Sequence, residues 1–289
     1  MNNSLLGEIL LKLESFPGLP KTGAKILALL EEPKTSADEI EKILKYDPGL
    51  TENFLKLANS TYFGIPSKVT SVKQAIVLLG FKRLKQIVLA TCTSDVMGKA
   101  VPGYDLQSGE LWRHSIAVSN VAVVLAKYKN LTEPNDIFTP GLLQDIGKLV
   151  LGRFVKEHFK VINQLRSNGI HLVVAENMVL GTDHAEIGAQ ILAQWSFPPI
   201  VVNAVRVHHN LELLHNKNMQ NDLLYLANIF CQKNGESFPK AANSGSINPA
   251  LKERLGIEPD KLESISNQIA KLVDDISAKL TFDSEYAKN

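Results

Sequence analysis

The sequence predicts an all-α fold, and three observations support this prediction. Apolar residues recur at spacings of three and four along most of the chain, which is the pattern of helices with one buried face. No convincing series of alternating apolar and polar residues indicates a sheet. Helix-start signals precede several apolar runs: Ser36 with Glu39 forms a capping-box pattern, and Asp47 stands directly before Pro48.

The first part of the chain contains several short helical patterns. An amphipathic helix is expected over residues 1–15, and Pro17 ends it. The next helices are separated by turn residues and are expected over 26–30, 37–44, 48–58, 72–79 and 81–97. Gly80 separates the last two of these helices. The region from Gly98 to Ser108, which includes Pro102, is the best candidate for a boundary.

The second part of the chain continues the helical pattern. Ser108 is expected to cap a long helix that runs through Leu125. Further helices are expected over 141–151, 153–168, 184–195, 199–208 and 223–230. Residues 234–249 are polar and rich in Gly, Ser and Asn, which indicates a mobile loop. A last amphipathic helix begins at Asp260 and could dock on the domain or on a partner.

Composition excludes several classes of protein. The 289 residues carry a net charge of +1, so no bulk positive field favours nucleic acid or an anionic membrane. The two cysteines, Cys92 and Cys231, are far apart, which argues against a disulfide framework and suits a reducing compartment. The N-terminus lacks the basic region of a signal peptide, and no apolar run is long enough to cross a bilayer. We therefore expect a cytoplasmic protein that binds neither membrane nor nucleic acid.

The segment 141–151 contains an acid and a base within an apolar helical pattern. Asp145 lies on the same stripe as Leu142 and Leu149, so its carboxylate is expected to point inward. A buried carboxylate requires a cation, a set of hydrogen-bond donors or a metal. Lys148 is one turn away and can pair with it. The segment is therefore either a structural ion pair or part of a functional site.

Four histidines are further candidates. His114, His184 and His208 are expected to point inward from helices, and His209 is adjacent. Each one alone is more simply a hydrogen-bonded core or surface residue. Histidines together with a carboxylate, however, are the ligands that borderline transition metals prefer. These four histidines and Asp145 are therefore candidate metal ligands, and the alternative is a vestigial polar cluster in which Lys148 or the histidines neutralise Asp145.

Other catalytic motifs are absent or weak. The sequence contains no phosphate-binding GxxxxGK[ST], no GxGxxG after a strand, no HExxH and no GxSxG. Asn59 and Ser60 lie in a turn-rich segment, where they either hold the backbone or contact a ligand. We predict Lys148, Asn59 and Ser60 as candidate ligand-binding residues.

Several blocks of sequence, in this order, resemble the HDOD domain family, a degenerate relative of the HD-domain metal-dependent phosphohydrolases. These blocks are Asp47-Pro48-Gly49-Leu50-Thr51, Leu57-Ala58-Asn59-Ser60-Thr61-Tyr62-Phe63-Gly64, Leu111-Trp112-Arg113-His114-Ser115, Gln144-Asp145-Ile146-Gly147-Lys148, His184-Ala185-Glu186-Ile187-Gly188 and His208-His209. The resemblance covers residues 16–212. It implies a two-lobed helical bundle with a first lobe over 16–98 and an HD-like lobe over 108–212. Residues 213–289 would form a C-terminal helical extension.

The resemblance also implies metal-ligand positions, and two of them have changed. His114 matches the first histidine ligand, and Asp145 matches the aspartate of the His-Asp pair. Gln144 stands where that pair has its histidine, and Asn228 stands where a closing aspartate is expected. Amides in place of an imidazole and a carboxylate weaken metal binding. The usual phosphohydrolase centre is therefore expected to be lost, and Asp145 and Lys148 remain as vestigial catalytic candidates.

A second metal position keeps its ligands. His184, His208 and His209 match the histidines of binuclear relatives, and together with Asp145 they form a complete set of three imidazoles and one carboxylate. The resemblance thus makes no metal obligatory but permits a divalent transition metal such as Fe, Mn or Zn.

The functional prediction follows from the changed positions. We predict a non-catalytic bacterial signal-transduction module of HDOD type, which acts through contacts with signalling partner proteins or with a small ligand. One alternative is a metal-dependent phosphohydrolase that acts on a nucleotide or cyclic dinucleotide. A second alternative is a nucleotide-binding sensor that does not hydrolyse its ligand.

Overall fold

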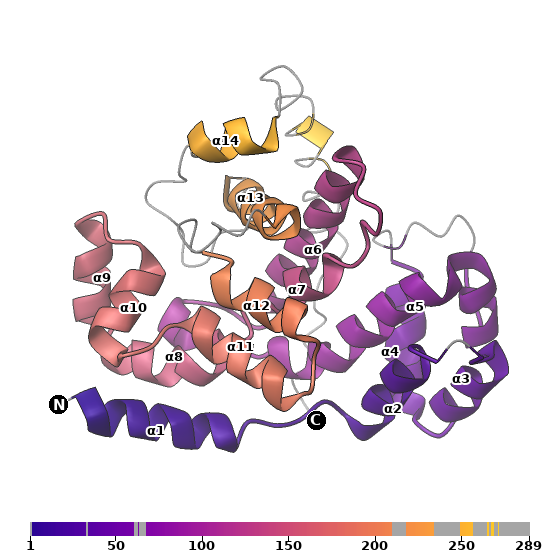
Figure 1. Ribbon diagram of the computed structural model, residues 1–289. Helices are drawn as coiled ribbons and strands as arrows, with labels where there is room; N and C mark the ends of the chain where they lie inside the picture. The colour runs from indigo at the N-terminus through magenta and orange to yellow at the C-terminus, as the bar shows by residue number, and fades with distance from the viewer. Residues whose placement is uncertain are drawn as a thin grey trace.

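The computed structural model confirms an all-α, two-lobed architecture (Figure 1). It describes residues 2–32, 34–60, 63, 68–209, 218–233, 249–256, 265, 267–268 and 271. Within these residues no strand occurs, and a single isolated bridge pairs Val101 with Leu106. In the described helices, no segment is long and apolar enough to cross a membrane.

The first lobe contains helices α2 to α4 and the beginning of α5. Their bounds are α2 (Lys21–Leu29), α3 (Ala37–Leu44), α4 (Pro48–Ala58) and α5 (Val72–Met97). The expected helix starts are present. Ser36 and Glu39 form both halves of a capping box, and the Asp47 carboxylate accepts a hydrogen bond from the Leu50 amide at 3.0 Å. Gly80 has φ 73° and ψ 169°, so it divides α5 at the predicted position.

The second lobe is built around α6 (Glu110–Tyr128), nearly all of whose faces are buried. The other helices of this lobe are α7 (Phe138–Leu143), α8 (Lys148–Glu157), α9 (Phe159–Ser167), α10 (Leu172–Leu180), α11 (His184–Gln194) and α12 (Pro199–Val207). Helix α7 packs directly on α6, and so does α13 (Met219–Lys233) of the C-terminal extension. A 3-10 turn, η1 (Pro102–Tyr104), packs on α8. Figure 1 shows α8 to α12 on one side of the molecule and α2 to α5 on the other.

Helix α1 (Asn2–Glu14) lies on the second lobe, although the chain then passes to the first. Its apolar face packs on α8 and α10, and Ile9 and Leu13 are buried. The segment after it is fixed to the same lobe, because Phe16 stacks on Trp195 and the Trp195 indole donates to the Pro17 carbonyl at 3.2 Å. The expected N-terminal helix is therefore present as α1 and helps to cover the second lobe.

Three sequence expectations about helix bounds were wrong. Segment 141–151 is interrupted by a turn at 144–147, and segment 153–168 is divided at His158. Ser108 does not cap α6. Its hydroxyl donates to the Gly98 carbonyl at 2.8 Å, and Gly109 in the left-handed conformation precedes the helix. Helix periodicity alone does not reveal such breaks, because the buried stripe continues across them.

Part of the expected C-terminal region lies outside the described residues. This applies to the loop predicted over 234–249, except for Pro249, which begins the unanticipated helix α14 (Pro249–Leu255). It also applies to most of the helix predicted from Asp260. The described extension is anchored to the second lobe, because α13 packs on α6, and the Arg254 guanidinium pairs with the buried Asp222 carboxylate at 2.5–2.6 Å.

Candidate metal centre

The carboxylate of Asp145, which is central to the candidate site, is positioned by a turn between two helices. Helix α7 ends at Leu143 and α8 begins at Lys148, so Asp145 lies in the connection rather than within a helix. Gln144, Asp145 and Lys148 are nevertheless 0%, 1% and 3% exposed. The sequence prediction that Asp145 points inward is therefore right, although the helical argument for it was not.

Glycine at 147 lets the histidine-bearing helix α11 approach this turn. A Cβ atom at Gly147 would lie 2.0 Å from the His184 carbonyl oxygen and 2.7 Å from the Gly188 amide nitrogen. Both neighbours are backbone atoms of α11, so they cannot move aside as a side chain could. This close contact brings His184, the first residue of α11, beside Asp145. His208 and His209 arrive from the end of α12, which contacts α11 and α7.

The structure brings four of the predicted ligands together. One ligand atom from each of Asp145, His184, His208 and His209 lies within 4.8 Å of the others. Asp145 Oδ1 is 3.3 Å from His184 Nε2 and 3.8 Å from His208 Nε2. The Nε2 atoms of His184, His208 and His209 are buried and have no hydrogen-bond partner.

Hydrogen bonds on the other ring nitrogen fix the tautomers of two histidines. His184 Nδ1 lies 2.6 Å from the Glu176 carboxylate, and His208 Nδ1 lies 2.6 Å from the Val205 carbonyl. Both partners only accept, so each Nδ1 must carry the proton. In the neutral ring the Nε2 lone pair then faces the Asp145 carboxylate, and two electron-rich atoms face each other. A cation between them, either a proton or a metal ion, removes this repulsion.

The electrostatics of the metal-free cluster agree with this geometry. Burial opposes ionisation of Asp145, but Lys148 and the neighbouring imidazoles outweigh it and hold the Asp145 pKa well below its usual range. Burial also opposes protonation of His184, but Glu176 and Asp145 raise its pKa to about 9. Burial lowers the pKa of both His208 and His209, and for His209 the neighbouring histidines add to this effect. Without metal, His184 therefore carries the extra proton.

The donor set fits a divalent transition metal. With metal–nitrogen bonds of about 2.0–2.1 Å, ligand atoms at tetrahedral positions lie roughly 3.3 Å apart. The separations from Asp145 Oδ1 to His184 Nε2 and His208 Nε2, 3.3 and 3.8 Å, are close to this value. Three imidazoles and a carboxylate suit Zn, Fe or Mn chemically. In this structure Lys148 Nζ lies 2.9 Å from Asp145 Oδ1, and its positive charge balances the charge of the carboxylate.

The other side of Asp145 shows a poorer ligand set. His114 Nε2 lies 3.4 Å from Asp145 Oδ2, so this histidine faces the second carboxylate oxygen. Gln144 is fully buried, and neither its side-chain oxygen nor its nitrogen has a hydrogen-bond partner. Asn228 is buried on α13, and its oxygen accepts a hydrogen bond from Gln232 at 3.4 Å. The two oxygens of Asp145 thus face different histidines, Oδ1 facing His184 and His208 and Oδ2 facing His114.

Sequence reasoning missed two residues that hold the centre in place. Glu176 is fully buried and accepts hydrogen bonds from His184 Nδ1 at 2.6 Å, the His184 amide at 3.0 Å and the Tyr104 hydroxyl at 2.7 Å. A signal was present, because Glu176 shares the apolar stripe of α10 with Leu172 and Leu180, as Asp145 shares one in its own segment. For Tyr104 no comparable signal exists, because it comes from the irregular segment before α6.

The residues predicted for ligand binding have different surroundings. Lys148 belongs to the cluster, through Asp145. Asn59 lies at the end of α4 in the first lobe, and its amide bonds to the Leu55 carbonyl and to both backbone groups of Val69, at 2.7–2.8 Å. The Ser60 hydroxyl donates to the Leu57 carbonyl at 2.6 Å. These bonds support the structural alternative for Asn59 and Ser60, and ligand contact by them stays a prediction.

The fold and the buried histidine–aspartate cluster define an all-α protein with a candidate metal centre. The model of the HDOD domain family matches residues 16–211, and the chain belongs to this family. A curated "Uncharacterized protein" of Treponema pallidum (strain Nichols) is 25% identical over 202 residues, which are 69% of this chain and 39% of that protein. The chain thus spans about two fifths of the length of this relative.

Solved structures show the same fold. An HDOD domain protein of unknown function from Geobacter sulfurreducens is 23% identical, with a TM-score of 0.76 over 95% of this chain and 98% of that one. A "Putative phosphohydrolase" from Shewanella amazonensis SB2B is 24% identical, with a TM-score of 0.72 over 94% and 98%. A "Putative signal transduction protein" from Marinobacter aquaeolei VT8 is 22% identical, with a TM-score of 0.73 over 96% and 65%. At these identities the likeness establishes the fold alone.

Proposed function

We propose that this chain is a non-catalytic regulatory HDOD module that holds one divalent transition metal ion through Asp145, His184, His208 and His209. The observation that carries the proposal is that Asp145 meets three histidines in one buried cluster, and that each of these histidines has a buried Nε2 atom without a hydrogen-bond partner. Buried polar atoms are nearly always satisfied, so three in one place call for a shared partner. The module would act on signalling proteins through its surface, as the sequence predicts.

The absence of catalysis follows from Gln144. By the family resemblance, Gln144 stands where the motif histidine would be, so it contributes no imidazole lone pair there, and neither of its buried polar atoms is bonded. Two retained ligands, His114 and one oxygen of Asp145, are too few to fix a second ion firmly. We therefore expect one ion to bind, and not the pair of ions that binuclear phosphohydrolases use to activate water against a phosphate ester.

Elemental analysis of protein purified without chelator tests the metal. We expect about one equivalent of Zn, Fe or Mn per chain, because the set has four ligands. His208→Gln should lower the occupancy at least about tenfold, since it removes one imidazole ligand. The control is His158→Gln, because His158 bonds the Phe154 carbonyl within α8 and does not belong to the cluster. Metal content that is equally low in wild type and His208→Gln would refute metal binding.

A hydrolase screen with added Mn²⁺ tests the non-catalytic part. We expect no turnover of nucleotides, cyclic dinucleotides or nitrophenyl phosphates. Turnover that Asp145→Ala abolishes would replace the proposal with the phosphohydrolase alternative. One observation favours that alternative: Lys148 Nζ is buried beside Asp145 and could neutralise phosphate charge if it turned away from the carboxylate.

Restoration of the missing ligand tests the position of Gln144. Gln144→His places an imidazole beside His114 and Asp145, so we expect a second equivalent of metal to bind, measured by calorimetric titration. Gln144→Leu is the matched control, because it fills similar space without a ligand atom. If Gln144→His binds no more metal than Gln144→Leu, Gln144 does not stand at a metal position.

A further inference from the structure

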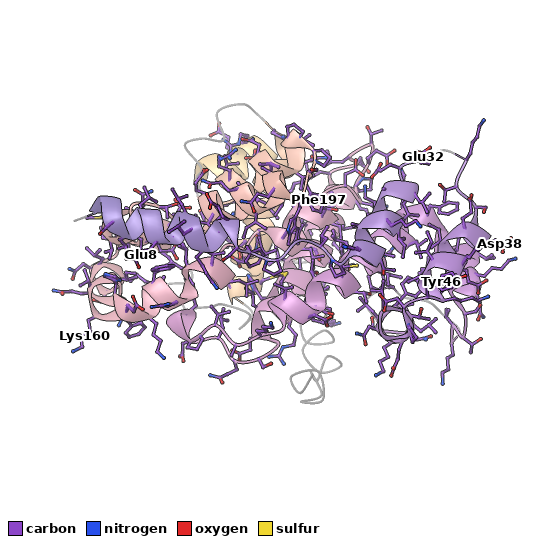
Figure 2. All side chains as sticks on the ribbon, turned by 90° about the horizontal axis from the view of Figure 1, so that it is seen from below. Glu8, Glu32, Asp38, Tyr46, Lys160 and Phe197 are labelled. Carbon is purple, nitrogen blue, oxygen red and sulfur yellow. The ribbon has the colours of Figure 1, made fainter. Side chains whose placement is uncertain are left out.

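A cavity of about 390 Å³ lies between α9 and the segment that leads into α6. One wall is a single face of α9. It is formed by Phe159, Ile162, Asn163 and Arg166, which are three or four residues apart along the helix and therefore lie on the same side. Lys160, on a different face of the same helix, points into solvent (Figure 2). The opposite wall is formed by η1 and the residues from 105 to 110. The volume is within the range of small-molecule sites, roughly 300–1,000 Å³.

Close backbone packing shapes the base of this cavity. A Cβ atom at Gly103 of η1 would lie 1.9 Å from the Gly152 carbonyl oxygen in α8. Only glycine allows this contact, which holds η1 directly on α8 and places the next residue, Tyr104, in the cavity wall. The cavity is therefore part of the packed second lobe rather than a gap between mobile segments.

Arg166 is the cation of this cavity. It is half-buried, and burial lowers the pKa of its guanidinium. Throughout the described part of the chain, its side chain forms no ion pair or hydrogen bond. The nearby Glu176 attracts it electrostatically, but that carboxylate is bonded to Tyr104 and His184. A partly desolvated guanidinium without a direct partner is suited to bind an anionic group.

The opposite wall carries negative charge. Glu110 has a side chain that is 20% exposed and accepts a hydrogen bond from the Gln107 amide at 2.6 Å. Its nearest cation, Arg113, is 4.0 Å away, so the Glu110 charge is only partly neutralised. Asp105 is exposed on the same wall. The α9 wall contributes the apolar part of the lining, with Ile162 buried and Phe159 48% exposed.

We propose that this cavity binds a small zwitterion with an apolar body, of the class of free α-amino acids. Its carboxylate pairs with Arg166, its ammonium faces Glu110 and Asp105, and its apolar part packs on Phe159 and Ile162. The charge pattern decides the class. One unpartnered cation opposite two carboxylates disfavours a dianionic phosphate and favours a ligand that carries both charges. The site is separate from the histidine cluster and does not depend on a metal.

Ligand analogues test the class of ligand. The probes are L-phenylalanine and L-leucine, together with 3-phenylpropionate, which lacks the ammonium, phenethylamine, which lacks the carboxylate, and GMP. Binding is measured by saturation-transfer NMR and calorimetry on the full chain. We expect saturable binding of an amino acid, with each single-charge analogue at least about tenfold weaker. GMP binding tighter than both amino acids, or no saturable amino-acid binding, would overturn the proposal.

Two matched variants test the location. Arg166→Gln should weaken amino-acid binding at least about tenfold, because the amide keeps the length of the side chain but loses the charge. Arg153→Gln is the control, since Arg153 is exposed on α8 and pairs with Glu157 at 2.9 Å. Circular dichroism verifies that both variants fold. Equal affinities in the two variants would show that the ligand, if it binds, does not use this cavity.

Discussion

Replacement of Glu176 by glutamine tests how the histidine centre is held. The carboxylate is fully buried and accepts three hydrogen bonds, two from His184 and one from Tyr104. Glu176→Gln keeps the size of the side chain and removes its charge. The His184 imidazole then loses the negative partner that fixes its Nδ1–H and raises the basicity of Nε2.

The expected changes in the free energy of unfolding and in metal affinity follow from these contacts. Hydrogen bonds to a charged group contribute about 1.5–3 kcal/mol and neutral ones about 0.5–1.5, so each bond that survives weakens by roughly 1 kcal/mol. Relief of a buried charge offsets part of this loss. We expect the free energy of unfolding to fall by about 1–3 kcal/mol. Loss of such a partner of a metal-binding histidine lowers metal affinity about 10- to 100-fold, or roughly 1.4–2.8 kcal/mol.

Calorimetric titration of chelator-treated protein with Zn²⁺ measures the metal affinity, and urea denaturation of the metal-free form measures stability. Glu157→Gln is the control, because its carboxylate is half-exposed and pairs with Arg153 on the surface. If Glu176→Gln binds Zn²⁺ within about twofold of wild type while remaining folded, Glu176 does not position a metal ligand.

Three further substitutions or reactions probe the packing. Gly147→Ala should destabilise the protein by about 2–4 kcal/mol, because its Cβ would meet the His184 carbonyl. Gly7→Ala is the control, because a Cβ atom there meets open space, and it should raise the thermal midpoint slightly or leave it unchanged. Asn59→Ala should lower the free energy of unfolding, measured by urea denaturation, by about 1–3 kcal/mol, because its hydrogen bonds to the backbone are lost. An unchanged free energy of unfolding would instead support the predicted ligand contact by Asn59. Burial raises the pKa of the Cys92 thiol to about 12, so a thiol reagent should modify it only after unfolding, and rapid labelling of the native protein would contradict its burial.

The sequence predicted local helices well where the signals were local. The capping box at Ser36 and the start at Asp47 lie within one turn of chain, and both are present. The break in α5 at Gly80 was predicted for the same reason, because glycine tolerates a positive φ. The breaks at 144–147 and at His158 were missed, because the apolar stripe continues across both of them.

Within the candidate site, residue types indicated the ligands but not their arrangement. His184, His208 and Asp145 were singled out because buried histidines and a carboxylate suit a metal, and tertiary packing does bring them together. Glu176 was overlooked although the same reasoning applied to it. The pairing of Glu176 with His184 depends on how α10 meets α11, which no local pattern contains.

The all-α class, the candidate ligands and the change at Gln144 could be predicted from the amino-acid sequence, because helix periodicity and residue chemistry are local properties. Tertiary packing was needed to show that the two oxygens of Asp145 face different histidines, and that among the described residues the Nε2 atoms of His184 and His208 have no hydrogen-bond partner. It also placed Arg166 in the wall of a cavity opposite Glu110 and Asp105. The physical reason is that the partner of a buried polar atom is set by contacts between helices distant in sequence. At Gly147 one such contact is so close that an added Cβ atom would lie 2.0 Å from the His184 carbonyl oxygen.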